Sequence, residues 1–285
     1  MSNAISTAPL FVPGNRPDRV RKARTVSDLI IVDLEDAVPP EEKAAARTAA
    51  AAVLSEAAPG VQQWVRVNPV GELETLTADL AALAPVAHHL NALVVPKVMA
   101  AADLGVFHEL TEAVLGTHVQ VIASIENAAG VRACWDIAEA QNVVTLLFGT
   151  VDLSADLGIT TSVEGTELLA ARSLVVMACA AAGVATPIDG PFTNIYDNVL
   201  LAQSCSHAAR LGFGSKIALH PSQLETIRTS FSPAAELVAW AHQVLAAYDD
   251  ARQRGVGVAR LDDGTFIDAP VATRARKVLT AVHDS

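Results

Sequence analysis

The chain has 285 residues, of which 51% are hydrophobic and 18% charged, and its 31 acidic against 20 basic residues give a formal net charge of −11. This length accommodates one large α/β barrel or two ordinary domains, and the high apolar fraction excludes intrinsic disorder. Nucleic acids and anionic membrane surfaces are disfavoured as partners, because the chain has neither clustered Lys and Arg nor aromatic-rich stretches.

Neither a membrane span nor a secretory signal is expected. The longest apolar run, Leu174 to Ala185, is much shorter than the roughly 20 residues of a spanning helix, and it predicts a buried helix. The first residues, MSNAISTAP, have no basic region followed by an apolar core. Cys134, Cys179 and Cys205 lie far apart and form no metal motif, so we interpret them as core residues of a reduced, cytoplasmic protein.

Eight short runs of aliphatic and β-branched residues predict eight strands. They begin at Leu10, Leu29, Gln63, Ala92, Val119, Val144, Val184 and Ser215. Stretches with helical spacing lie between most of them, and the repeat of about 29 residues is long enough for one strand and one helix. The runs are continuously apolar, which is typical of parallel strands buried on both faces.

Eight consecutive strand–helix units favour a TIM (β/α)8 barrel. The alternative, a doubly wound open sheet, would favour a glycine-rich phosphate loop after an early strand, and LFVPGNRPDR from Leu10 contains no such loop. We therefore predict a barrel domain over residues 1–230.

Residues 231–285 exceed what closing a barrel requires. The segment from Phe231 to Gly255 predicts an amphipathic helix, GVGVARLDDGTFIDAP predicts a hairpin or loop, and the segment from Val271 to His283 predicts a last helix. We expect this C-terminal extension to act as a lid or as a subunit-docking arm.

Polar side chains gather at the predicted carboxyl ends of the strands, where TIM barrels carry their catalytic groups, whereas the strand starts are apolar. These residues are Arg16, Asp33, Glu35, Asp36, Arg66, Asn68, Lys97, Glu126, Asn127, Asp152, Asp189 and His220. The asymmetry is typical of an enzyme.

Glu126 and Asp152 are the two rim residues that most clearly indicate a site. They are separated by about one strand–helix unit, which places them at the ends of adjacent strands about 5 Å apart. Two carboxylates without a Cys or a His pair suit Mg²⁺ and not zinc, and Mg²⁺ leaves positions for water and a chelating substrate. The alternative is that each carboxylate stabilises the start of the following helix; we favour the metal site.

Arg66 is predicted on the same rim. A guanidinium there can hold a substrate carboxylate through two parallel bonds and neutralise a developing enolate oxygen. An ion pair with the acids of the preceding strand is the alternative, and both can hold. Glu35 and Asp36 can act as metal or water ligands, or stabilise a helix N-terminus. Among these carboxylates we expect Lys97 to be charged, which argues against a Schiff-base aldolase.

Six motifs in order carry a family resemblance: LFVPGNRPDR, DLIIVDLEDAVPPEEKAAAR, WVRVNP, IASIENAAGV, GTVDLSADLG and LGFGSKIALHPSQ. They resemble the citrate lyase β-subunit (CitE-like) proteins of the HpcH/HpaI aldolase superfamily, from Leu10 to about Val278. The resemblance implies a (β/α)8 barrel, assembled as a homotrimer or hexamer, that cleaves or forms carbon–carbon bonds of acyl-CoA thioesters.

The resemblance also implies roles for individual residues. Mg²⁺ would be bound by Glu126 of the IEN motif and Asp152 of the VDLS motif, and the substrate carboxylate by Arg66 of the VRVN motif. Asp268 of FIDAP would reach a neighbouring subunit's active site, although from the residues alone Asp268 can simply cap a helix. Related tails often read GRGAF where this chain has GVGVA, so the arginine of that motif is missing.

Phe11 and Arg16, at the end of the first strand, are predicted to contact the thioester arm and a phosphate of CoA. The alternative for Arg16 is an ion pair with the acids of the second strand.

The predicted function is that of a cytoplasmic Mg²⁺-dependent lyase acting on a 3-hydroxy-3-carboxy acyl thioester of the malyl, citramalyl or citryl type. Cleavage yields a 2-oxo acid such as oxaloacetate, held by the metal on Glu126 and by Arg66, and an acetyl enolate that Asp268 or water protonates. CoA or an acyl-carrier protein can carry the thioester. The alternatives are a class II 2-oxo acid aldolase without CoA and a noncatalytic metabolite-binding barrel subunit.

Overall fold

The computed structural model describes residues 5–162 and 165–283 of the chain. The described residues divide into two compact units, residues 5–227 and residues 228–283. The sequence prediction placed its division after residue 230.

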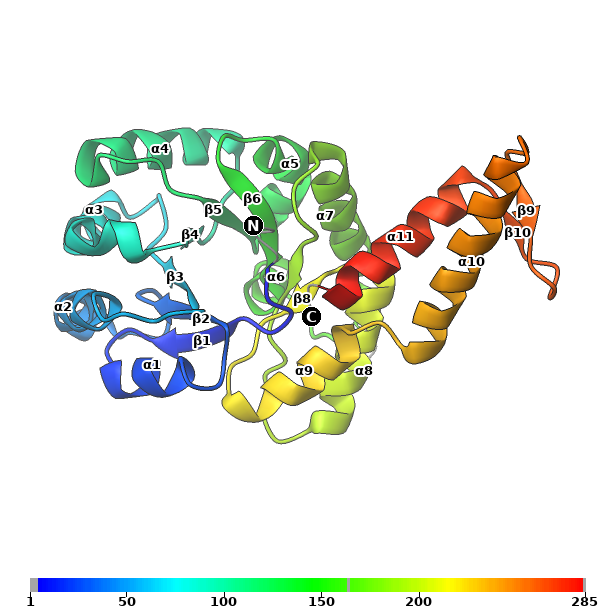
Figure 1. The fold of residues 1–285 in the computed structure, drawn as a ribbon. Coiled ribbons are helices and arrows are strands. Elements are labelled where there is room, and N and C mark those ends of the chain that lie inside the picture. The colour runs from blue at the N-terminus through cyan, green and yellow to red at the C-terminus, as the bar shows by residue number, and fades with distance from the viewer. Residues whose placement is uncertain (1–4, 163–164, 284–285) are drawn as a thin grey trace. The chain divides into compact units, whose positions relative to one another are not determined.

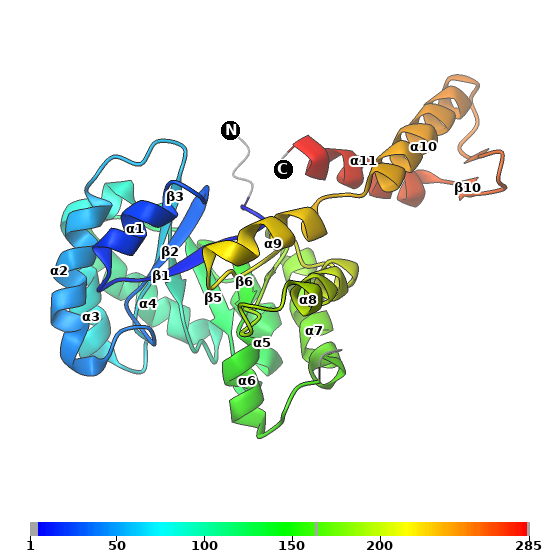
Figure 2. The same ribbon diagram turned by 90° about the horizontal axis from the view of Figure 1, so that it is seen from below.

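The first unit is built on one eight-stranded sheet (Figures 1 and 2). Its strands are β1 (Leu10–Pro13), β2 (Leu29–Asp33), β3 (Gln62–Arg66), β4 (Ala92–Val95), β5 (Val121–Ile125), β6 (Val143–Phe148), β7 (Ile188–Asp189) and β8 (Ser215–Lys216). All adjacent strands are parallel, and their order in the sheet is their order in the chain. The eight predicted parallel strands are confirmed.

The sheet curls until its first and last strands approach each other. The Phe11 N–H donates to the Ala218 carbonyl at 3.0 Å, and the Ala218 N–H donates to the Pro9 carbonyl at 2.8 Å. This arrangement is that of a TIM-barrel-like α/β fold, in which the carboxyl ends of all strands share one face.

Burial on both faces explains why the strands are continuously apolar. Every residue of β2, β4 and β5 is buried. One face contributes to a central core of Leu29, Ile31, Trp64, Ala92, Val94, Ile122, Leu147, Ile188 and Ile217. The other face packs against the helices, which lie outside the sheet (Figure 2).

The helices that follow the strands are α1 (Pro17–Ala23), α2 (Lys43–Leu54), α3 (Leu73–Leu83), α4 (Ala101–Leu115), α5 (Ala128–Ala138), α6 (Thr150–Leu157), α7 (Leu169–Ala182), α8 (Asn198–Leu211) and α9 (Leu224–Phe231). The long apolar run contributes the second half of α7, which ends at Ala182 because Gly183 adopts a left-handed conformation with φ 69°. Within the described ranges, no helix combines the length and the hydropathy needed to cross a membrane.

The three cysteines are buried and form no disulfide. Burial raises the pKa of Cys134, and it raises the pKa of Cys179 to about 11. Both thiols are therefore protonated core groups at neutral pH, as their helical context predicts.

The second unit contains α10 (Ala235–Gln253), a hairpin of β9 (Ala259–Arg260) and β10 (Phe266–Ile267), and α11 (Ala269–His283). The sequence predicted a helix, a hairpin or loop, and a helix, and the connecting segment is a hairpin. The first of these helices begins at Ala235 rather than Phe231, because Phe231 ends α9 and Pro233 disfavours helical geometry in the residue before it. The two helices pack around a core of Ala241, Val244, Tyr248, Ile267, Ala272 and Ala275.

Candidate active site

A cavity of about 390 Å³ lies at the carboxyl ends of the strands in the first unit. Asp33 and Asp36 of the predicted rim line it, and so do four of the residues proposed to contact metal or substrate: Phe11, Arg66, Glu126 and Asp152. These four come from β1, β3, the residue after β5 and α6, which the parallel sheet brings to one face. We call this space the carboxylate cavity.

Arg66 is held by acids at the end of β2 and just after it. Its Nε and Nη2 donate to the two carboxylate oxygens of Asp33 at 2.8 and 2.7 Å, and its Nη1 lies 2.6 Å from Glu35 Oε2 and 3.4 Å from Asp36 Oδ2. The guanidinium carbon lies 4.8 Å from the centre of the Phe11 ring. The predicted ion pair with the preceding acids is confirmed, and it sets the plane of the arginine.

These neighbouring carboxylates keep the Arg66 guanidinium protonated. Burial lowers the pKa of Arg66, but the carboxylates of Asp33, Glu35 and Asp36 outweigh burial, and the pKa ends above its ordinary value. The side chain is 15% exposed. It is therefore a permanent, oriented cation at the cavity wall.

Glu126 is buried and held by two donors. Its Oε1 accepts the backbone N–H of Lys97 at 2.5 Å, and its Oε2 accepts the Ser124 hydroxyl at 3.0 Å. The sequence reasoning missed both donors. Ser124 could have been predicted from its position two residues before Glu126, because residues two apart in an extended segment face the same side.

Asp152 lies in the first turn of α6, not at the strand end where the sequence reasoning placed it, because β6 stops at Phe148. Burial raises the pKa of Glu126, and the negative charge of Asp152 raises it further. Gly149, the N-cap of α6, allows the start of α6 to lie against Glu126, since a Cβ at residue 149 would overlap the Cβ of Glu126.

The pair fits Mg²⁺ by its donor chemistry. Both side chains are carboxylates, and their mutual repulsion would be relieved by a cation between them. Among the described residues, no group of three or more His, Cys, Asp and Glu side chains is arranged to hold a metal ion. Two protein carboxylates are nevertheless a usual number for Mg²⁺, which keeps several waters.

Glu35 and Lys97 complete the charged cluster. Burial raises the pKa of Glu35 to about 8, with Arg66 opposing that shift and Glu126 adding to it. The Lys97 ammonium lies 3.2 Å from Glu35 Oε1. Burial lowers the pKa of Lys97, but Glu35 and Asp36 raise it by more, so the lysine is charged as expected. Glu35 therefore contacts cations rather than stabilising a helix start.

Arg16 and Asp268 do not line the carboxylate cavity. Arg16 pairs with Asp18, two residues along, at 3.1 and 3.0 Å. The ion pair of Arg16 with the second-strand acids, the alternative to a phosphate contact, does not form, because those acids are engaged by Arg66. Asp268 belongs to the second unit, where its Oδ1 accepts the Val271 N–H at 3.1 Å and caps α11.

Three further rim residues make structural contacts. The Asn68 side chain donates to Leu34 and Asp79, and His220 Nδ1 accepts the Ser222 N–H. Asp189 forms a buried ion-pair group that is described below.

Comparison with known proteins identifies the family. The family HpcH/HpaI aldolase/citrate lyase matches residues 8–221. A citrate lyase subunit beta-like protein of Deinococcus radiodurans is 35% identical, over 97% of each chain. A (3S)-malyl-CoA thioesterase of Cereibacter sphaeroides is 33% identical, over 95% of this chain and 92% of that protein.

Solved structures agree with the sequence comparison. The protein CitE of Mycobacterium tuberculosis, in complex with magnesium, acetoacetate and coenzyme A, is similar with a TM-score of 0.83 and 32% identity, over 98% of this chain and 99% of that chain. A citrate lyase beta subunit of the same organism, complexed with oxaloacetate and magnesium, has a TM-score of 0.71 and 31% identity, over 81% of this chain and 98% of that chain. The chain therefore belongs to the HpcH/HpaI aldolase/citrate lyase family, as a citrate lyase β-subunit-like enzyme.

Proposed function

We propose that the protein is a Mg²⁺-dependent carbon–carbon lyase that cleaves or forms a 3-hydroxy-3-carboxy acyl-CoA of the malyl, citramalyl or citryl type. The observation that carries the proposal is the carboxylate pair Glu126 and Asp152 in one cavity with the oriented cation Arg66. The magnesium, acetoacetate and coenzyme A bound by the similar CitE protein support it.

Glu126 and Asp152 would hold the Mg²⁺. When bound, Mg²⁺ would act as a Lewis acid on the oxygens of a chelating substrate. Ser124 and the Lys97 N–H keep the Glu126 carboxylate oriented for that role.

Arg66 would bind the carboxylate of the 2-oxo acid. Its Nε–Nη2 edge is occupied by Asp33, and its Nη1 faces Glu35 and Asp36. The substrate would therefore use the remaining N–H group on Nη2 and displace Asp36, the more distant partner, from Nη1. The same cation would stabilise the negative charge that develops as the carbon–carbon bond breaks. Phe11, packed on the guanidinium, would contact the thioester arm.

The acetyl enolate released by cleavage needs a proton on carbon. We infer that Asp268 of a neighbouring subunit supplies it, either directly or through water. This role requires a homo-oligomer, a trimer or a hexamer, in which residues 231–285 form a lid or docking arm over the neighbouring cavity. Arg16 would bind a CoA phosphate by exchanging its Asp18 partner, and the protein would work in the cytoplasm.

Hydrolysis of the thioester is a second candidate activity, because one relative at 33% identity is a (3S)-malyl-CoA thioesterase. Product analysis separates the two activities. Malyl-, citramalyl- and citryl-CoA are incubated with and without Mg²⁺, and oxo acid, acetyl-CoA and free CoA thiol are measured.

A lyase releases oxo acid and acetyl-CoA in equal amounts and only with Mg²⁺, without free thiol. Free thiol together with an intact hydroxy acid identifies a thioesterase. No product from any thioester, in a protein that still binds Mg²⁺, contradicts both activities and leaves a metabolite-binding protein.

A further inference from the structure

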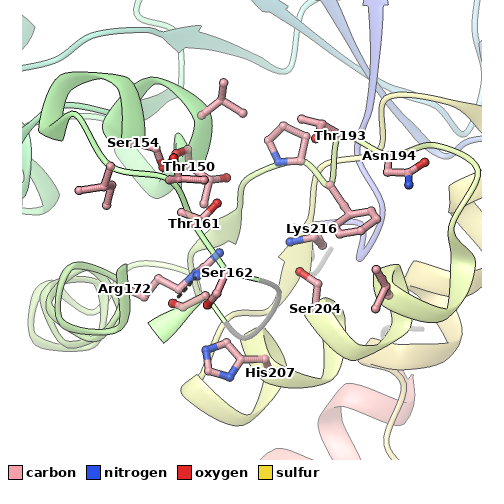
Figure 3. A pocket seen from close by; sticks show the side chains of 17 residues that line it. Thr150, Ser154, Thr161, Ser162, Arg172, Thr193, Asn194, Ser204, His207 and Lys216 are labelled. Atoms are coloured by element: carbon pink, nitrogen blue, oxygen red, sulfur yellow. Dashed lines mark hydrogen bonds between the residues drawn. The ribbon is translucent and has the colours of Figure 1, made fainter. Parts of the chain in front are cut away.

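A second cavity, of about 500 Å³, lies beside the carboxylate cavity in the first unit (Figure 3). Its walls come from α6, α7, α8 and β8 and from the segments after α6 and β7. Thr150, Val151, Pro191 and Thr193 line both cavities, so the two share a wall. We call the second space the hydroxyl cavity; the proposed reaction does not use it.

Two buried cations line the hydroxyl cavity and share one carboxylate. Arg172 Nε lies 3.2 Å from Asp189 Oδ1, and Lys216 Nζ lies 2.5 Å from Asp189 Oδ2. The side chains of Arg172 and Lys216 are 7% and 2% exposed. In Figure 3 the Lys216 side chain extends from β8 toward the space bordered by Thr161, Ser162 and Arg172.

The charges in this group do not balance. Burial raises the pKa of Asp189, but Lys216 and Arg172 outweigh burial and hold that pKa below its ordinary value, so the carboxylate is ionised. One negative charge thus faces two positive ones. None of the described residues that line the cavity is acidic. Because an uncompensated buried charge is costly, the cavity favours an anion over a neutral or cationic occupant.

Hydroxyl groups line the same cavity, and two of them are engaged elsewhere: the Ser154 hydroxyl donates to the Thr150 carbonyl and the Ser162 hydroxyl to Glu167. Seven hydroxyl side chains line the cavity: Thr150, Ser154, Thr160, Thr161, Ser162, Thr193 and Ser204. Thr150 Oγ1 and His207 Nε2 are buried and have no hydrogen-bond partner among the described residues. Burial, aided by Arg172 and Arg210, lowers the pKa of His207, so its ring is neutral and one of its nitrogens can donate.

We propose that the hydroxyl cavity binds a small oxyanion, a phosphate or carboxylate group, on Arg172 and Lys216. Paired cations and the hydroxyl groups that line the same cavity match the several acceptor lone pairs of such groups. The lone Asp189 carboxylate keeps the two cations in place and leaves them with N–H groups to spare.

The test uses two aspartate substitutions on one helix. Ser204→Asp places a carboxylate in the cavity, whereas Ser206→Asp places the same charge on α8 at an exposed position that does not line it. Binding of inorganic phosphate and of malonate is measured by titration calorimetry in chloride buffer without Mg²⁺ or thioester. The melting temperature of each variant is recorded in the same buffer.

We expect wild type to bind at least one of the two anions with a dissociation constant of about 1 mM or tighter. Ser204→Asp should weaken that binding at least about 10-fold and raise the melting temperature, because its carboxylate replaces the anion beside the cations. Ser206→Asp should bind as wild type does. Binding of phosphate alone or of malonate alone identifies which of the two groups the cavity takes.

Three results would overturn the proposal: no binding of either anion to wild type, equal binding by wild type and Ser204→Asp, or equal loss in both variants. Because neither Mg²⁺ nor thioester is present, such a failure leaves the proposed lyase activity untouched.

Discussion

The backbone N–H of Lys97 donates a hydrogen bond to Glu126 Oε1 at 2.5 Å. Lys97 makes this contact from a left-handed conformation with φ 55°, which residues other than glycine seldom adopt. Strained backbone of this kind persists where the surrounding structure requires it, and it clusters at functional sites. Here it directs an N–H at the carboxylate proposed to hold the metal.

Neutralising either carboxylate should abolish Mg²⁺ binding. In Glu126→Gln and Asp152→Asn we expect loss of measurable Mg²⁺ affinity and of Mg²⁺-dependent turnover, because Mg²⁺ depends on anionic oxygen ligands. The melting temperature of Glu126→Gln should not fall, since burial already disfavours the ionised form. Glu112→Gln, at an exposed site on α4, is the control. Wild-type affinity in both variants would place the metal elsewhere.

Arg66→Lys should bind the oxo acid poorly although it keeps the charge. Lysine lacks the planar fork that Asp33 orients, and loss of a charge-assisted pair costs about 1.5–3 kcal/mol, or roughly 10- to 150-fold in affinity. Oxaloacetate affinity in the presence of Mg²⁺ is the measurement, with exposed Arg132→Lys as the matched control. Unchanged affinity in Arg66→Lys is incompatible with the proposed clamp.

Gly149→Ala should damage the metal site without touching a charge. The added methyl group would overlap Glu126, and overpacking of this kind costs about 1–3 kcal/mol of stability. We expect weaker Mg²⁺ binding together with a lower melting temperature. Gly105→Ala is the control, because Gly105 is an exposed residue of α4 and nothing lies within 4 Å of a Cβ built there. This substitution should be neutral or slightly stabilising. If the two variants behave alike, the close contact at Gly149 is unimportant.

Glu35 should make stability fall as pH rises. Its pKa is raised to about 8 in the folded state, above the ordinary value of 4.5, so the folded state binds the proton more tightly than the unfolded state does. The contribution of protonated Glu35 to the unfolding free energy is complete below pH 4.5, and it is lost as the pH rises from there to about pH 8. Denaturant titrations of wild type and Glu35→Gln across this window should give a difference in unfolding free energy that changes with pH. A constant difference would contradict the raised pKa.

Asp268→Asn tests the proposed proton donor. Asparagine can still accept the Val271 N–H, so the cap on α11 is preserved. If Asp268 protonates the enolate, turnover should fall roughly 10²–10⁴-fold while Mg²⁺ and oxo-acid affinities stay nearly constant.

Mixed oligomers test whether that site is shared between subunits. Mixing Asp268→Asn with Glu126→Gln subunits should restore partial activity, because some sites would combine an intact cavity with an intact tail. No recovery after verified subunit exchange would rule out a site shared between subunits.

The sequence by itself determined the eight parallel strands and the meeting of Phe11, Arg66, Glu126 and Asp152 at one cavity. The reason is periodicity: short, continuously apolar runs that alternate with helical stretches at a regular spacing are typical of strands in a covered parallel sheet, whose carboxyl ends share one face. It also predicted the two C-terminal helices, but it left open whether a hairpin or a loop connects them.

Tertiary structure alone decided which way the rim side chains point. Strands β7 and β8 have two residues each, too few for an alternating pattern to show that Asp189 and Lys216 face the helices rather than the carboxylate cavity. The capture of Glu126 by the Lys97 N–H likewise depends on the left-handed backbone angles of Lys97, just after β4. Such angles are set by packing between elements far apart in the chain, which no local pattern records.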